Sequence, residues 1–173
     1  MTGDNLAFRD ALVSLLPRLR RFALALAGRK DLAEDLLHSA LERALRNWSA
    51  FQNGRRLDSW MFKIMQNQWV DMRRAEARTM TQPFEDLDFE GEDGRETLER
   101  RDEMRAARAA FANLAEEHRT VLALIVFEGL SYSEVAETLS IPLGTVMSRL
   151  SRARSAMAAL MQGATFSKVK KHN

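Results

Sequence analysis

Apolar residues recur at helical spacing along almost the whole chain of 173 residues, and this periodicity constrains the fold more than any other feature. Each stripe places its apolar side chains three or four positions apart, which is the pattern of a helix that buries one face. The alternation of apolar and polar residues that is typical of strands occurs nowhere in the sequence. The sequence therefore predicts an all-α fold.

Three apolar stripes occupy the first part of the chain, at residues 6–26, 32–48 and 57–78. Gly28 follows the first stripe as a helix terminator, and Pro17 is expected to kink or divide the helix that contains it. Asp31 followed by Glu34 predicts a capping pair at the start of the second helix. We thus expect three helices before the pattern is lost.

The helical period disappears over residues 79–97, where one proline and two glycines stand among seven acidic residues. This composition predicts a flexible acidic linker between two small helical domains. The formal net charge is +5 for residues 1–78, −7 for residues 79–104 and +4 for residues 105–173. The two basic blocks indicate either two modules that bind a polyanion such as nucleic acid or helix faces that are simply solvated.

Helical patterning returns in the second half of the chain, at residues 98–114, 118–127, 133–139 and 142–161. Gly129 is a predicted stop, and Ser131 with Glu134 forms a predicted capping box. The short helix, tight turn and longer helix between Gly129 and Arg154 fit the helix-turn-helix pattern. The apolar residues expected to face inward in this motif are Val135, Ala136, Leu139, Ile141, Val146 and Leu150.

The opposite face of the longer helix is polar and partly basic. Its residues are Thr145, Met147, Ser148, Arg149, Ser151, Arg152 and Arg154. Such a face can enter the major groove of DNA, where arginine and small polar side chains contact bases and phosphates. A solvated amphipathic helix would show the same periodicity, but the turn, the caps and the exposed arginines together favour DNA recognition.

The segment GTVMSRLSRAR at residues 144–154 resembles the recognition helix of extracytoplasmic-function (ECF) sigma factors, a subfamily of the sigma-70 type. Response-regulator DNA-binding domains share a similar helix and turn, so the amino-terminal half must separate the two families. There, LAEDLLHSALERAL at residues 32–45 resembles the sigma-factor helix that docks on the clamp helices of RNA polymerase. The alternative is an acidic helix whose leucines all belong to the core. The polymerase-binding residues that the resemblance implies are Asp31, Glu34, Asp35, Leu37, His38, Leu41 and Glu42.

The next segment, LDSWMFKIMQNQWVDMRR at residues 57–74, resembles the sigma-factor segment that recognises and opens the minus-ten promoter element. Strand opening requires a pocket for an extruded base and cations for the exposed backbone. Trp60 is expected in the core, and for Trp69 a buried role is favoured over base stacking. The minus-ten DNA contacts that the resemblance implies are Arg56, Asn67, Asp71, Arg73, Arg74 and Arg78.

The resemblance also implies a division of the chain and a function. A polymerase-binding and minus-ten domain (sigma domain 2) is expected at residues 1–78, the acidic linker at 79–97, a minus-thirty-five helix-turn-helix domain (sigma domain 4) at 98–162 and a basic tail at 163–173. The implied function is that of a subunit which binds core RNA polymerase, directs promoter-specific initiation and helps to open the promoter, under the control of an anti-sigma factor. The alternatives are a DNA-binding regulator that never joins polymerase and a decoy that occupies an anti-sigma factor.

The residue inventory excludes several other functions. The chain has no cysteine, so disulfides, thiolate metal clusters and cysteine nucleophiles are impossible. Its three histidines lie in different predicted elements, and no phosphate-binding glycine loop or nucleophile elbow is present. We therefore expect no enzyme activity, cofactor or metal. We also expect a cytoplasmic protein without membrane insertion, because no apolar run approaches ~20 residues and nothing marks the amino terminus for export.

Overall fold

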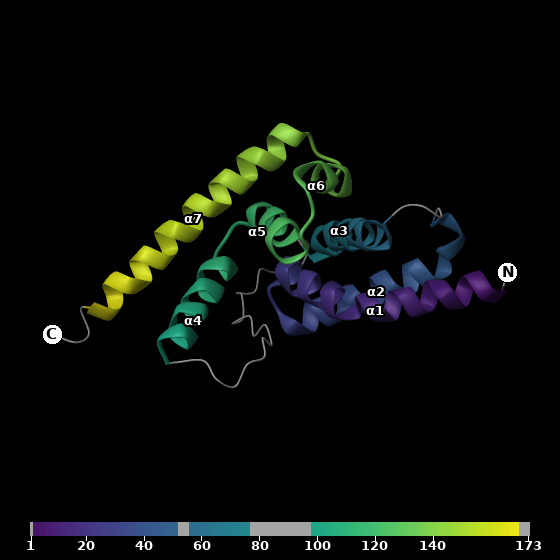
Figure 1. Ribbon diagram of the computed structural model, residues 1–173, viewed down its shortest axis with the longest axis horizontal. Helices are drawn as coiled ribbons and strands as arrows, with labels where there is room; N and C mark the ends of the chain where they lie inside the picture. The colour runs from purple at the N-terminus through teal and green to yellow at the C-terminus, as the bar shows by residue number, and fades with distance from the viewer. Residues whose placement is uncertain (1, 52–55, 77–97, 170–173) are drawn as a thin grey trace.

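The structure is a computed structural model that describes residues 2–51, 56–76 and 98–169. Every regular element in these ranges is helical (Figure 1), so the predicted all-α fold is confirmed. None of the described helices is long and apolar enough to cross a membrane. In chain order the elements are α1 (Thr2–Ala27), α2 (Lys30–Arg46), the 3-10 helix η1 (Trp48–Ala50), α3 (Leu57–Glu76), α4 (Leu98–Ala112), α5 (Glu116–Leu122), the π-helix η2 (Ala123–Phe127), α6 (Tyr132–Leu139) and α7 (Leu143–Val169).

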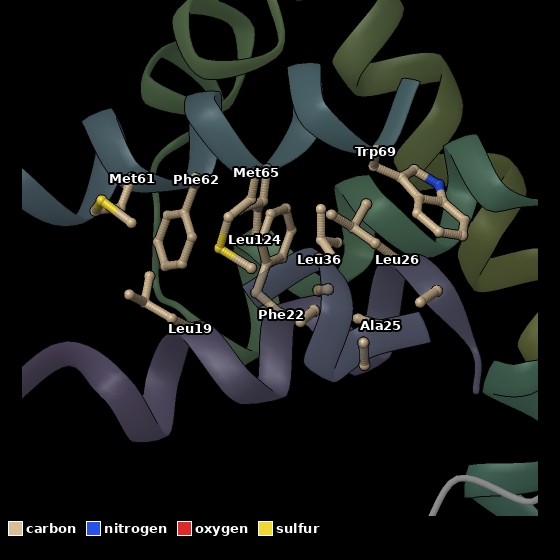
Figure 2. Packing of buried hydrophobic residues seen from close by; sticks show 14 of the residues in the cluster. Leu19, Phe22, Ala25, Leu26, Leu36, Met61, Phe62, Met65, Trp69 and Leu124 are labelled. Carbon is tan, nitrogen blue, oxygen red and sulfur yellow. The ribbon is translucent and has the colours of Figure 1, made fainter. Parts of the chain in front are cut away.

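Helices α1, α2 and α3 pack on one another around large apolar side chains. Figure 2 shows Leu19 and Phe22 of α1 opposite Met61, Phe62 and Met65 of α3, and all five side chains are buried. The rings of Phe22 and Phe62 meet edge to face with their centroids 4.9 Å apart, a favourable arrangement for two aromatic quadrupoles. This layer fixes the position of α3, the helix that carries the predicted minus-ten residues.

Helix α1 continues through Pro17, so the helix is not divided at this proline. Pro17 is exposed, whereas Leu12 and Leu19 on either side of it are buried. Burial of the apolar face before and after the proline stabilises one continuous helix against the loss of a single backbone hydrogen bond.

The predicted capping pair at the start of α2 is wrong. Gly28 ends α1 with a φ of +70°, which leaves Arg29 in an extended conformation as the N-cap residue of α2. Asp31 therefore lies inside the first turn, and its carboxylate accepts a hydrogen bond from Arg29 Nε at 3.1 Å. An acidic residue in this turn still interacts favourably with the positive end of the helix dipole, but Asp31 and Glu34 form no capping box.

The helix-turn-helix is confirmed in its local detail. Ser131 Oγ accepts a hydrogen bond from the Glu134 backbone N–H at 3.2 Å, and Glu134 Oε2 accepts one from the Ser131 backbone N–H at 2.7 Å. The turn between α6 and α7 places Ser140 at a φ of +55°, and the Ile141 N–H closes it on the Ala136 carbonyl at 3.0 Å. All six apolar residues predicted to face inward are buried or packed against the core.

The two halves of the chain share one hydrophobic core. Helix α5 packs on α1, and α6 packs on α3, which lies between α6 on one side and α1 and α2 on the other (Figure 1). Leu124 of η2 lies in the same apolar layer as Phe22 and Met65 (Figure 2) and is completely buried. The described residues thus form a closed arrangement in which the helix-turn-helix half is docked on the first half.

Arg119 of α5 crosses this junction. It is only 3% exposed, and its guanidinium donates hydrogen bonds to the backbone carbonyls of Ala25 and, at 2.9 Å, of Leu26. A third bond, 3.0 Å long, goes to the Leu114 carbonyl within its own half. Burial lowers the pKa of Arg119 to about 10, yet the side chain stays charged at neutral pH. It therefore places a cation on the last carbonyls of α1, where the helix dipole is negative.

A second, ionic junction lies on Arg18 of α1. Its Nη1 contacts Asp58 Oδ2 at 3.0 Å, and its Nε contacts Glu128 Oε2 at 2.8 Å. Asp58 belongs to α3 and Glu128 follows η2, so one guanidinium joins both halves. Asp58 is also bound by Arg56 Nη2 at 2.7 Å and accepts the Ser59 backbone N–H at 2.7 Å. Burial acts to raise the pKa of Asp58, but these hydrogen bonds outweigh it and hold the pKa below its ordinary 3.8.

The expected acidic linker at 79–97 lies outside the described residues. Helix α7 runs on to Val169, so helix continues into the segment that was expected to be a basic tail from residue 163. Ala115 is the N-cap residue of α5 with an extended ψ of 141°.

We expect Gly129→Ala to lower the free energy of unfolding by about 1 kcal/mol, because Gly129 has a φ of +68° and an L-residue is strained there. A methyl group at this position would meet no atom within 4 Å, so the backbone alone is responsible. The measurement is the urea midpoint at unchanged m value. Gly144→Ala is the matched control, since its methyl also meets open space but the residue lies in α7; its midpoint should stay or rise. Equal losses in both variants would contradict the explanation.

Asp58 should make stability depend on pH in the acid range. Because its pKa is lower in the folded than in the unfolded chain, its contribution is complete above about pH 4 and is lost as the pH falls through the folded value. We expect Asp58→Asn to cost about 2 kcal/mol at pH 7 and to show a smaller further loss between pH 7 and pH 3 than the parent. Urea unfolding across this range measures both effects. The exposed Asp71→Asn should follow the parent curve, and an Asp58→Asn curve parallel to the parent would refute the assignment.

Candidate polymerase and DNA interface

The predicted polymerase surface lies on one acidic side of α2. Four of its residues are exposed, namely Asp31, Asp35, His38 and Glu42, and Glu34 and Leu41 are half-buried. Leu37 is only 3% exposed and packs in the core, so in this arrangement it positions the helix and offers no contact surface. Its predicted contact with polymerase stays a prediction that this arrangement does not expose.

Neighbouring arginines already neutralise part of this acidic surface. Arg20 Nε of α1 lies 3.1 Å from Glu34 Oε1, and Arg46 Nη2 lies 3.8 Å from Glu42 Oε2. The hydrogen bond from Arg29 and that from the Leu32 backbone N–H lower the pKa of Asp31. Asp35 is thus an exposed carboxylate of this surface at which a partner arginine can be tested.

The predicted minus-ten residues are spread along α3. Asn67, Asp71, Arg73 and Arg74 are exposed on its second half, and Arg56 is exposed directly before its first turn. Arg78 lies outside the described residues. At 1.5 Å per residue, Arg56 and Arg73 are separated by about 25 Å along the helix axis. The structure does not bring these residues into one cluster but spreads them along one helix. This spread suits contact with an extended single strand of DNA.

Both end cations of α3 contact the second half of the chain. Arg56 Nη1 is hydrogen-bonded to Glu134 Oε1 of α6, while Nη2 binds Asp58. Hydrogen bonding to Asp58 is the main reason that the pKa of Arg56 is raised, with Glu134 adding to it. Arg73 Nε lies 3.6 Å from Glu116 Oε2 of α5, and its guanidinium lies over the ring of Trp69. Trp69 is 2% exposed, so its predicted buried role is confirmed.

An aromatic cluster lies just before and at the start of α3 and consists of Phe8 of α1, Phe51 and Trp60. The ring centroids are 5.8 Å apart for Phe8 and Phe51 and 5.5 Å apart for Phe51 and Trp60. The sequence did not predict the part of Phe8 and Phe51 in this cluster. Trp60 is half-buried and packs against the core, as expected. The spacing of Phe8 and Phe51 in the sequence gives no signal of this contact, because it depends on how α1 crosses α3.

The recognition surface of α7 faces away from the core. Met147 is 53% exposed, and Ser148, Ser151, Arg152 and Arg154 are exposed with it. Thr145 and Arg149 are half-buried. The opposite face of the helix buries Val146, Leu150 and Ala153, which fixes the rotation of α7 about its axis. Five of the seven predicted minus-thirty-five residues are therefore exposed in the closed arrangement.

A polar cavity of about 470 Å³ lies between α3, α5 and the helix-turn-helix. Arg73 of the predicted minus-ten set and Arg149 of the predicted minus-thirty-five set both line it, together with Glu116 and Glu117. One residue of each predicted DNA-contact set thus lines the same cavity in the closed structure. Within the described ranges, no group of three or more histidine, aspartate or glutamate side chains is placed to hold a metal ion.

Comparison with known proteins relates both halves of the chain to sigma factors. Residues 104–157 match the family model "Sigma-70, region 4", and residues 12–66 match "Sigma2 domain of PhyR". The chain is 34% identical over 161 residues to the ECF RNA polymerase sigma factor EcfG of Rhodopseudomonas palustris, which covers 90% of this chain and 85% of the relative. It is 30% identical over 162 residues to the ECF RNA polymerase sigma factor SigM of Mycobacterium tuberculosis, with 93% and 80% covered.

Solved structures show the same fold. The sigma factor RpoE of Bartonella quintana, in complex with the anti-sigma factor NepR, superimposes with a TM-score of 0.74 at 27% identity, over 90% of this chain and 97% of that one. CnrH, in complex with the cytosolic domain of CnrY, superimposes with a TM-score of 0.67 at 21% identity, over 94% and 92%. The helix-turn-helix, the acidic α2 and the similarity to EcfG over 90% of this chain lead to one conclusion: the chain belongs to the ECF RNA polymerase sigma factors.

Proposed function

We propose that this sigma factor binds core RNA polymerase through α2, captures the minus-ten strand along α3 and reads the minus-thirty-five element with α7. The observation that carries the proposal is the rotation of α7. Its apolar face is buried while Met147, Ser148, Ser151 and Arg152 stand on one exposed strip. A helix of this kind in a helix-turn-helix fits the major groove, where these side chain types contact base edges and phosphates.

The charges of the helices support distinct partners. The exposed carboxylates of α2 suit arginines on a protein surface, because carboxylate and guanidinium pair through directed hydrogen bonds. The exposed arginines at the end of α3 and on α7 suit phosphates. A single chain that offers both can join polymerase to promoter DNA, and its binding energy then selects the start site.

In the proposed function, RNA polymerase carries out the catalytic reaction. This chain is a specificity subunit without a catalytic site, cofactor or metal of its own, and it contributes binding energy for promoter recognition and opening. Because its partners are core polymerase and promoter DNA, we place its action in the cytoplasm. We assign residues 1–78 to domain 2, 79–97 to the linker and 98–162 to domain 4; the matched segments 12–66 and 104–157 fall inside the two domains.

We further propose that an anti-sigma factor controls this protein. The Bartonella quintana relative is described in complex with the anti-sigma factor NepR, and that structure shares 27% sequence identity with this chain. A partner that holds domains 2 and 4 together would keep both DNA-binding surfaces from a promoter. A helical segment with apolar residues and acidic side chains would complement the basic surfaces of α3 and α7.

The proposed function is tested by run-off transcription with purified core polymerase on a genomic promoter library, with and without this protein and at stated salt. New starts that share two spaced elements are the expected result. A regulator that never joins polymerase would bind DNA without producing starts, and a decoy would bind an anti-sigma factor without doing so.

Arg152→Ala should reduce promoter use while leaving polymerase binding intact, because it removes a cation only from the exposed strip of α7. We expect weaker promoter binding by roughly five- to a hundredfold if the arginine contacts a base, and a smaller salt dependence if it contacts a phosphate. Run-off transcription and core-binding assays measure the two activities separately. Arg101→Ala on α4, an exposed arginine outside the recognition helix, should leave both unchanged. Equal loss of both activities in Arg152→Ala would refute the assignment of Arg152 to promoter contact.

Asp35→Lys should weaken the binding of core polymerase by at least tenfold, because it places a like charge opposite the arginines proposed to face α2. Binding of the isolated sigma factor to minus-thirty-five DNA should not change, since Asp35 and α7 lie in different halves of the chain. Titration of labelled core polymerase measures the effect. Asp10→Lys makes the same charge change at an exposed position of α1 and serves as the control. A similar loss in both variants would show a general charge effect and no docking site on α2.

A further inference from the structure

Two exposed apolar side chains lie one turn apart at the start of helix α7. Leu143 is the first residue of the helix and is 49% exposed, and Met147, four positions further on, is 53% exposed. Residues four apart lie on the same side of a helix. Neither side chain belongs to the apolar core, to which α7 contributes Val146 and Leu150 instead. The pair is therefore an exposed apolar surface beside the polar side chains of the helix.

The position of this apolar pair on α7 decides what it meets on DNA. In a helix-turn-helix, the amino-terminal residues of the second helix contact base edges in the major groove. Leu143 and Met147 are the first and fifth residues of α7, and Ser148, which follows directly, is exposed with them. The apolar pair is thus continuous with the surface proposed to read the minus-thirty-five element. The sequence did not mark Leu143 as a DNA contact.

The chemistry of the major groove offers one apolar group to such a surface. Base edges there present mainly hydrogen-bond donors and acceptors, which an isobutyl or thioether side chain does not satisfy, and phosphates offer charge. The C5-methyl group of thymine is the apolar exception. Its contact with Leu143 or Met147 removes apolar area of both partners from water, which is favourable. A polar base edge at the same place would lose water without gaining a hydrogen bond.

We propose that Leu143 and Met147 read the C5-methyl groups of two neighbouring thymines in the minus-thirty-five element, so that this apolar pair helps to determine promoter specificity. The proposal rests on the proposed function, because it takes α7 as the recognition helix. Four residues of an α-helix span about 6 Å along its axis, and successive bases of a strand lie about 3.4 Å apart. The two side chains therefore reach thymines in adjacent base pairs or in pairs separated by one step. The flexible side chain of Met147 adapts to the methyl group that it meets.

The test uses the full-length protein bound to core polymerase and a promoter duplex taken from the run-off library. Each thymine of the upstream element is replaced in turn, on either strand, by deoxyuridine, which pairs as thymine does and lacks only the C5-methyl group. We expect promoter binding to weaken about three- to fivefold at each of two positions, the factor that follows from burial of one methyl group. Deoxyuridine between the two promoter elements should have no effect.

Alanine variants assign the two positions to the two side chains. The deoxyuridine effect should disappear at one position in Met147→Ala and at the other in Leu143→Ala, because the contact of the methyl group has been removed. Leu160→Ala is the matched control and should keep both effects, since Leu160 is also exposed on α7 but lies far from its amino-terminal turns. All three side chains are exposed, so none of the variants should lower the urea midpoint.

The proposal would be overturned if no thymine of the element lost affinity with its methyl group, or if both effects persisted in Leu143→Ala and in Met147→Ala. Weaker binding of core polymerase in these variants, with unchanged deoxyuridine effects, would also overturn it and would show that the apolar pair contacts polymerase. Failure of the proposed function would appear differently, as absence of polymerase-dependent starts from the parent protein, and the inference would fail with it.

Discussion

The closed structure depends on a buried arginine placed on the end of a helix. Arg119 donates to the carbonyls of Ala25 and Leu26 in the last turn of α1, and thereby satisfies acceptors that a helix end leaves without intrahelical partners. Desolvation of a guanidinium costs free energy unless its donors are satisfied. Since these acceptors belong to α1 while Arg119 belongs to α5, the bonds that make its burial tolerable also join the two halves. Leu124 can then be buried in the core of the first half.

Packing of the two halves leaves some of the proposed functional surfaces exposed and brings others into contact with the opposite half. The acidic side of α2 and the polar strip of α7 remain exposed, while Arg56 and Arg73 at the two ends of α3 contact acids of the second half. The surfaces proposed to meet polymerase and the minus-thirty-five element are therefore accessible in the same arrangement that covers the proposed minus-ten surface.

Local features could be predicted from sequence because their physics is local. The capping box at Ser131 and Glu134 and the stop at Gly129 depend on a few neighbouring residues, and the burial of Trp69 follows from its place in an apolar stripe. Predictions failed where a neighbouring element decided the outcome. Asp31 does not cap α2, because Gly28 ends α1 and makes Arg29 the N-cap residue of the next helix.

The sequence by itself determined the helices, the helix-turn-helix and the family, since periodicity, caps and short motifs are written in adjacent residues. Only the tertiary structure decided which charged residues are exposed on the surface and which form contacts between helices. Arg18, Arg56 and Arg119 look alike in the sequence, yet their partners in the structure differ. Arg18 binds Asp58 of α3 and Glu128 after η2, Arg56 binds Glu134 of α6, and Arg119 binds the end of α1. Electrostatic partners are chosen by distance in space, and residues 18 and 128 or 25 and 119 come together only when the two halves pack.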